Sequence, residues 1–192
     1  RKSVDQGHDP VEVVNALTEV LKDVGRKFES GEIFLVHLVQ AGDAAKRATV
    51  EVLEPLIKKS SAKREMLGKI LIGTVVGDIH DIGKNIVSMM LFTAGFEVND
   101  IGKDVPTEDF VQKTREYSPD IVAMSALLTT TLPAQLEVIE ALKKAGLRQK
   151  VKVLVGGAPV TAKWAKEAGA DGYGEDAIEA VRVAKQLMGI KE

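Results

Sequence analysis

From about residue 68 onward, the sequence alternates short apolar runs with helix-like segments, and this alternation restricts the fold more than any other feature. The apolar runs are rich in β-branched residues, which is typical of strands that are buried on both faces of a sheet. The segments between them place apolar residues at helical spacing, and several end at a glycine. The predicted strands are residues 70–76, 96–101, 121–125, 151–155 and 172–173, and the predicted helices are residues 84–94, 107–117, 132–145, 158–168 and 176–188.

Five strands that alternate with five helices predict an α/β fold with a parallel, doubly wound sheet of the flavodoxin-like or Rossmann-like kind. In such sheets, ligands bind beyond the carboxyl ends of the strands, at the point where the strand order reverses. The loops after the first, third and fourth predicted strands are therefore where a binding site is expected.

The first 60 residues follow a different pattern. Apolar residues fall at helical spacing from residue 10 to residue 59, which predicts two long amphipathic helices. The break between them lies at residues 29–32, and Pro55 marks a kink or an end in the second helix. We therefore expect a helical cap domain at residues 1–60, a polar linker at 61–67 and an α/β domain at 68–192.

Composition excludes several kinds of partner and site. The formal net charge is -2 and no clustered basic face is visible, so neither nucleic acid nor an anionic membrane is an expected partner. The chain contains no cysteine, which excludes disulfides, thiolate-bound metals and iron–sulfur clusters. No apolar run reaches the roughly 18 residues of a membrane span. Together these features predict a cytoplasmic protein.

The loop after the first predicted strand contains Asp78, His80 and Gly83. A histidine at a strand end can ligate a metal ion through one ring nitrogen while a nearby carboxylate holds the other. The same pattern also arises from a helix N-cap followed by a surface histidine, so by itself it is weak evidence. Lys84 and Asn85 follow at a predicted helix N-terminus, where an anion could bind, but the sequence does not decide this point.

The loops after the third and fourth predicted strands also carry unusual residues. Ser125 and Leu127 follow the third strand, together with threonines at positions 129–131 that could instead cap the helix that starts near residue 132. Gly156 and Gly157 follow the fourth strand, and they could form an ordinary strand-to-helix turn in the absence of any ligand.

Taken together, the three loops resemble the signature of the cobalamin-binding domain. Asp-x-His-x-x-Gly stands at residues 78–83, Ser-x-Leu follows after 41 residues, and Gly-Gly follows after a further 28. Residues 31–35 and 50–55 resemble the helical cap that precedes this domain in cobalamin-dependent methionine synthase and in the small corrinoid proteins of anaerobic methyltransferase systems. The family cap is a four-helix bundle, whereas two clear helices precede residue 60, so we expect that its first helix is trimmed or absent.

The resemblance implies a cobalamin or related cobamide as cofactor and a role for each matched residue. His80 would ligate the cobalt from below and displace the nucleotide base of the cofactor, while Asp78 would accept a hydrogen bond from the other ring nitrogen. Thr131 stands where the family usually has a serine, which implies a relay from Thr131 through Asp78 to His80. The full set of implied cofactor-binding residues is Asp78, His80, Asp81, Ile82, Gly83, Ser125, Leu127, Thr129, Thr131, Gly156 and Gly157, with Phe34 and Leu38 of the cap above the corrin and His80 as the metal ligand.

A displaced nucleotide tail would need a slot beside the sheet. The resemblance implies that Gly83, Gly156 and Gly157 let the backbone approach this tail where a Cβ atom would clash. Ser125 and Thr129 would offer hydroxyl groups to the base or to its linker.

The implied function is that of a non-catalytic methyl carrier in one-carbon metabolism. A donor-specific methyltransferase would load the methyl group, a second methyltransferase would pass it to tetrahydrofolate or a thiol, and a reductive activator is a further expected partner. Three alternatives remain open: a cap plus cobalamin-binding fragment of methionine synthase, a cobalamin-dependent sensor that controls gene expression, and a module of a radical mutase. The sequence indicates neither the methyl donor nor the lower base of the cobamide.

Overall fold

The computed structural model describes residues 3, 6–53, 55–56 and 66–190. The chain divides into two compact units, one formed by Arg1–Met66 with Phe92–Gly95 and the other by Leu67–Leu91 with Phe96–Glu192. The first unit contains the N-terminal helices, and the second contains the sheet. Most of the predicted linker at residues 61–67 lies outside the described residues, so the predicted domain boundary stays a prediction.

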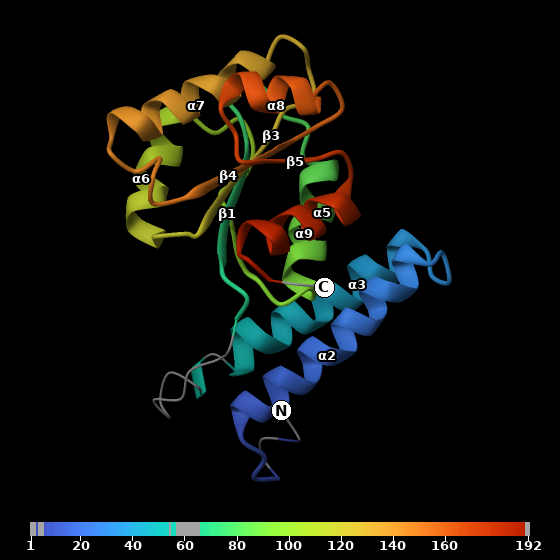
Figure 1. Cartoon of the computed structure of the whole chain (residues 1–192). Coiled ribbons are helices and arrows are strands. Elements are labelled where there is room, and N and C mark those ends of the chain that lie inside the picture. The colour runs from blue at the N-terminus through green and yellow to red at the C-terminus, as the bar shows by residue number, and fades with distance from the viewer. Residues whose placement is uncertain (1–2, 4–5, 54, 57–65, 191–192) are drawn as a thin grey trace. The chain divides into compact units, whose positions relative to one another are not determined.

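The second unit is built on one five-stranded sheet in which every pair of neighbouring strands is parallel. The strand order is β2-β1-β3-β4-β5, so the direction of winding reverses between β1 and β3. This order confirms the predicted doubly wound sheet of the flavodoxin-like kind. The strands are β1 (Lys69–Thr74), β2 (Glu97–Asp100), β3 (Ile121–Ser125), β4 (Lys152–Gly156) and β5 (Gly172–Gly174) (Figure 1).

Helices cover both faces of this sheet. Figure 1 shows α6, α7 and α8 on one side of it and α5 and α9 on the other. This arrangement follows from right-handed crossovers between parallel strands, which place helices on opposite faces once the winding direction reverses. The helices are α5 (Ile82–Thr93), α6 (Thr107–Tyr117), α7 (Leu132–Lys144), α8 (Ala162–Ala168) and α9 (Ala177–Leu187).

Helix α8 is the one helix of the sheet unit whose predicted start is clearly wrong, because it begins at Ala162 and not near residue 158. The chain first makes a turn in which the Val160 N–H donates to the Gly157 carbonyl at 2.9 Å. Thr161 then caps the helix. Side-chain patterns do not reveal such a turn, since the residues that form it are also compatible with a helix.

The apolar core packs β1 and β3 against α6 and α7. Phe110 of α6 is completely buried and packs so close to β1 that a Cβ atom at Gly73 would lie 2.9 Å from its ring. Val138 and Ile139 of α7 are completely buried in the same way. Burial of each such side chain contributes roughly 1.5–3 kcal/mol to the stability of the fold. A well-packed core therefore supports the carboxyl edge of the sheet.

Among the described residues, the helical unit contains the two long helices that were predicted, α2 (Pro10–Glu29) and α3 (Leu35–Arg47). Gly31, with a φ of 78°, lies in the connection between them. The second helix is α-helical only as far as Arg47 and continues as a short π-helix, η1 (Ala48–Leu53), which the sequence did not predict. Within the described residues, no helix is both long and apolar enough to cross a membrane.

Candidate functional site

Three loops meet at the carboxyl edge of the sheet, where the winding direction reverses. Thr74 at the end of β1 pairs with Ser125 at the end of β3, and Ser125 pairs with Gly156 at the end of β4. The pairing continues one residue further, because the Val75 N–H donates to the Ser125 carbonyl at 3.1 Å. The loops that carry the three sequence blocks therefore start side by side.

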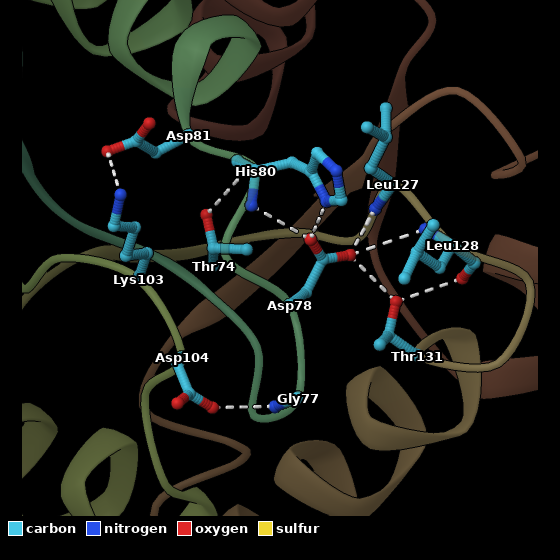
Figure 2. A network of polar contacts seen from close by, with 10 residues as sticks. All are labelled: Thr74, Gly77, Asp78, His80, Asp81, Lys103, Asp104, Leu127, Leu128 and Thr131. Carbon is cyan, nitrogen blue, oxygen red and sulfur yellow. Dashed lines mark hydrogen bonds and ion pairs between the residues drawn. The ribbon is translucent and has the colours of Figure 1, made fainter.

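The carboxylate of Asp78 joins the first two of these loops (Figure 2). Its Oδ1 atom accepts the backbone N–H of His80 at 3.0 Å and lies 2.8 Å from the ring Nδ1 of the same residue. Its Oδ2 atom accepts the backbone N–H of Leu127 at 2.6 Å, the hydroxyl of Thr131 at 2.8 Å and, more distantly, the N–H of Leu128 at 3.3 Å. Asp78 is completely buried, so this set of donors replaces the water that the carboxylate loses on folding.

The surroundings of Asp78 favour its ionised form. Burial alone raises the pKa of the carboxyl, but the hydrogen bonds from the N–H groups of Leu127 and His80, from Thr131 and from the His80 ring outweigh it. The net result is a pKa well below the usual range of an aspartate. An ionised carboxylate can only accept hydrogen bonds, so the His80 Nδ1 carries a proton.

This assignment determines the chemistry open to His80. When the ring is neutral and Nδ1 carries the proton, Nε2 has a free lone pair. Figure 2 shows the ring with Nδ1 toward Asp78 and its second nitrogen directed away from the carboxylate. The side chain is 47% exposed, so Nε2 can reach a ligand that lies on this edge of the sheet. A histidine held in this way is the usual form of a metal ligand with a carboxylate behind it.

Thr131 occupies the N-cap position of α7 but does not cap it, because its side chain accepts no hydrogen bond from the first turn. The hydroxyl lies 2.8 Å from Asp78 Oδ2 and 2.9 Å from the Leu128 carbonyl, and its single proton can serve only one of them at a time. The carboxylate is the stronger acceptor because it is charged. The expectation that one of the threonines at 129–131 caps the helix is therefore wrong for the side chain of Thr131.

Exposed apolar side chains are concentrated on the two loops that Asp78 joins. Large side chains of this kind are usually buried, and a group of them on one edge of a protein marks a binding surface. His80 lies between two of these apolar residues, Ile79 and Ile82. The group consists of Val76 (39% exposed), Ile79 (64%), Ile82 (77%), Leu127 (40%) and Leu128 (41%).

The glycines of the three blocks differ in what the fold itself requires. Gly157 has a φ of 123°, and a Cβ atom there would lie 1.8 Å from the Ala126 carbonyl oxygen, while one at Gly156 would lie 3.0 Å from that of Gly174. The turn therefore needs a glycine at position 157 whether or not a ligand is bound, and it leaves little space for a side chain at position 156. Gly83 is different, because a Cβ atom there would meet nothing within 4 Å and its φ is not positive. Nothing in the packing around Gly83 calls for a glycine.

The remaining predicted residues of the sheet unit lie around this edge. Ser125 is half-buried and its hydroxyl has no hydrogen-bond partner among the described residues, whereas Thr129 is exposed. Asp81 lies 3.6 Å from the Lys103 ammonium. The ammonium of Lys84 is buried against the carboxylate of Asp100, so it is not free to bind an anionic group at the helix N-terminus.

The two predicted cap residues differ in exposure. Phe34 is 75% exposed and precedes α3, whereas Leu38 is completely buried and acts as a core position. Contact of either residue with a cofactor stays a prediction.

Sequence reasoning missed the loop after β2, which contributes to the same network. Asp104 accepts the Gly77 N–H at 2.7 Å, as Figure 2 shows. Asp104 lies in none of the three sequence blocks, and its role depends on a backbone contact that side-chain patterns do not show.

Replacement of Asp78 by asparagine tests the charge on this carboxylate. An amide group would turn its N–H donors either toward the donors of Leu127 and Thr131 or toward those of His80, so Asp78→Asn should cost on the order of 2 kcal/mol of stability at neutral pH. Because the folded-state pKa lies below the ordinary 3.8, the stabilisation is complete above that value and is lost as pH falls through the lower, folded-state pKa. Urea unfolding of the unloaded protein should show the difference between wild type and variant shrinking below about pH 4.

The control is Asp81→Asn, on the same loop, whose exposed ion pair contributes little. A stability loss for Asp78→Asn that is equally large in acid and at neutral pH would contradict the ionised state.

Comparison with known proteins identifies the family. A family model described as a B12 binding domain matches residues 68–182, and a second model with the same description matches residues 1–53. Two similar curated proteins are dimethylamine corrinoid protein 3 of Methanosarcina mazei and trimethylamine corrinoid protein 2 of Methanosarcina acetivorans. The first is 54% identical over 168 residues (88% of this chain and 99% of the relative), and the second is 52% identical over 183 residues (95% and 84%).

Solved structures agree with this result. The methanol:cobalamin methyltransferase complex from Methanosarcina barkeri contains a chain that matches with a TM-score of 0.85 and 31% identity, over 97% of this chain and 70% of that one. The monomethylamine corrinoid protein of the same organism matches with a TM-score of 0.60 and 36% identity, over 97% of this chain and 87% of that one. The two family models together account for both units, and the chain therefore belongs to the family of B12-binding corrinoid proteins.

Proposed function

We propose that this protein carries a methyl group on a cobamide between two methyltransferases, with Nε2 of His80 as the lower ligand of cobalt and the base of the cofactor displaced. The observation that carries the proposal is the buried, ionised Asp78, which holds the His80 Nδ1 at 2.8 Å and leaves Nε2 free. Imidazole is a suitable ligand for a metal ion such as cobalt.

The residues around His80 fit a large, flat cofactor with an apolar face. Ile79, Ile82 and Leu127 offer exposed apolar side chains on the loops that surround the imidazole. Gly83 leaves open space at the start of α5, where a ligand could lie against the backbone. Ser125 offers a half-buried hydroxyl at the end of β3, with no hydrogen-bond partner in the part of the chain that the structure describes. Exposed apolar groups and open space that the fold does not need are what a bound corrinoid would use.

When bound, the corrinoid supplies a cobalt centre that accepts and releases a methyl group. Asp78 keeps the proton on Nδ1 of His80 and makes the imidazole a stronger ligand through Nε2. Thr131 supports the carboxylate by its hydrogen bond of 2.8 Å.

The names of the relatives point to a methylamine as the methyl donor. Two of them are named as a dimethylamine and a trimethylamine corrinoid protein, and the matching solved structures include a monomethylamine corrinoid protein. These names favour the carrier over the fragment of methionine synthase, the sensor and the mutase module. We propose a methylamine-specific methyltransferase as the loading partner and a thiol- or tetrahydrofolate-methylating enzyme as the unloading partner.

Replacement of His80 tests the ligand. His80→Ala protein reconstituted with a cobamide should still bind it, because the apolar contacts remain, but its absorption spectrum should lose the features of histidine ligation with the base displaced. His8→Ala is the matched control, since His8 is an exposed histidine of the other unit and should leave the spectrum unchanged. An unaltered spectrum in His80→Ala would rule out this ligand.

Replacement of Gly83 and of Gly157 by alanine distinguishes a glycine that a ligand contacts from a glycine that the fold requires. Gly83→Ala should leave the melting temperature of the unloaded protein unchanged or slightly raised, because alanine favours a helix and meets no neighbour. It should weaken cobamide binding about tenfold or more, as expected when a methyl group is forced into a close contact. Gly157→Ala should instead destabilise the unloaded protein, because its Cβ atom clashes with Ala126. Unchanged cobamide affinity in Gly83→Ala, measured by titration, would show that no ligand approaches there.

A transfer assay tests the donor. The reduced, cobamide-loaded protein should become methylated when it is mixed with a dimethylamine- or trimethylamine-specific methyltransferase and its substrate, and the change is visible in the corrinoid absorption. A methanol-specific methyltransferase is the comparison. Methylation by the methanol enzyme alone would contradict the proposed donor class.

A further inference from the structure

The short segment at residues 100–104, which starts at the last residue of β2 and leads toward α6, holds the His80 loop at two places. Asp104 contacts the start of this loop at Gly77 and Asp78, and Asp100 pairs with Lys84 just beyond its end. No sequence block includes this segment. The loop that presents His80 is therefore fixed at both ends by one neighbouring connection.

Asp104 makes two hydrogen bonds to the backbone that precedes His80. Its Oδ1 atom accepts the Gly77 N–H at 2.7 Å, and its own N–H donates to the Asp78 carbonyl at 3.0 Å. Figure 2 shows its carboxylate directed at the Gly77 nitrogen, on the opposite side of the loop from Thr131. The side chain of Asp78 is held from one side by Thr131, and its backbone from the other by Asp104.

The backbone at this contact adopts conformations that few residues accept. Asp104 has a φ of 52°, in the left-handed region that aspartate and asparagine tolerate better than most residues, and Gly77 has a φ of 80°. Directly after Asp104, Val105 donates its N–H to the Thr74 carbonyl at 3.0 Å and continues the parallel pairing with β1. This pairing keeps Asp104 beside the His80 loop.

The far end of the loop is fixed through a buried charge. Lys84 lies in the first turn of α5 and is 3% exposed, and its ammonium contacts the carboxylate of Asp100 and, at 2.7 Å, the side chain of Asn85. The other oxygen of Asp100 accepts the Gly102 N–H at 2.9 Å. This contact fixes the start of the segment, as Asp104 fixes its end.

The ion pair between Lys103 and Asp81 is a weaker link. It spans 3.6 Å, and the side chains of Lys103 and Asp81 are 50% and 32% exposed, so it adds little to the position of the loop. Among the contacts of the segment, those of Asp104 lie nearest to the residues that orient His80.

We propose that Asp104 is a positioning residue, which sets the place of Asp78 and thereby the direction of the His80 imidazole. The hydrogen bonds of Asp104 to this loop go to the backbone of Gly77 and Asp78, so Asp104 acts on His80 through that backbone. The inference rests on the proposed function, because its consequence is the extent of histidine ligation to cobalt.

Three substitutions separate the side-chain contact from the backbone conformation. Asp104→Asn keeps an acceptor oxygen and should behave like the wild type. Asp104→Ala removes the acceptor and keeps the unfavourable φ, while Asp104→Gly removes the acceptor and relieves it. Exchange of the Gly77 amide in the unloaded protein, followed by NMR, should be about tenfold faster in the alanine and glycine variants, as expected for the loss of one hydrogen bond. Circular dichroism checks that each variant is folded.

The second readout is the spectrum of the cobamide-loaded protein. The alanine and glycine variants should show a smaller histidine-ligated fraction than the wild type, and the asparagine variant should restore it. Faster Gly77 exchange with an unchanged ligated fraction would overturn the positioning role, and so would unchanged exchange. If His80→Ala also leaves the cobalt ligation unchanged, the proposed function fails first and the positioning role fails with it, whereas a response to His80→Ala alone rejects only the role of Asp104.

Discussion

The carboxyl edge of the sheet depends on one buried carboxylate. Asp78 accepts five hydrogen bonds, two from the backbone and ring of His80 and three from Leu127, Leu128 and Thr131. Burial of a charge without such partners would cost several kcal/mol. The Asp78 carboxylate can therefore be buried in its charged form only because these donors are present. Because the donors come from the loops after β1 and β3, the same contacts also join the two loops at the point where the winding direction reverses.

Some residues near the joined loops are required by the fold, whereas others are available to a ligand. Gly157 is required by the turn after β4, and Lys84 is used within the protein as the partner of Asp100. Gly83, the exposed side chain of Ile82 and Nε2 of His80 are not needed by the fold, and these are the groups that a corrinoid could use. A metal cofactor whose lower ligand is held in one direction needs rigid loops that position this ligand. It also needs apolar side chains that are available to contact it.

The sequence predicted the sheet and the meeting of the three loops at one edge of it, because both depend on local patterns. Runs such as 121–125 have the composition of buried strands, and parallel strands bring their carboxyl ends to one edge. The start of α8 and the π-helical turn after Arg47 were not predictable, since they depend on backbone hydrogen bonds and packing. The roles of Lys84 and Asp104 were missed because their partners lie on a different loop, and a spacing pattern does not show which side chains meet.

In the proposed function, the imidazole of His80, and not the nucleotide base of the cofactor, is bound to cobalt. The most direct measurement is electron paramagnetic resonance of the protein loaded with a cobamide in the cobalt(II) state, prepared once with unlabelled histidine and once with histidine labelled with nitrogen-15. If His80 is the ligand, the splitting from the axial nitrogen should change with the label, and the change should disappear in His80→Ala. A splitting that is the same in both preparations would show that the nitrogen comes from the cofactor and that His80 is not the ligand.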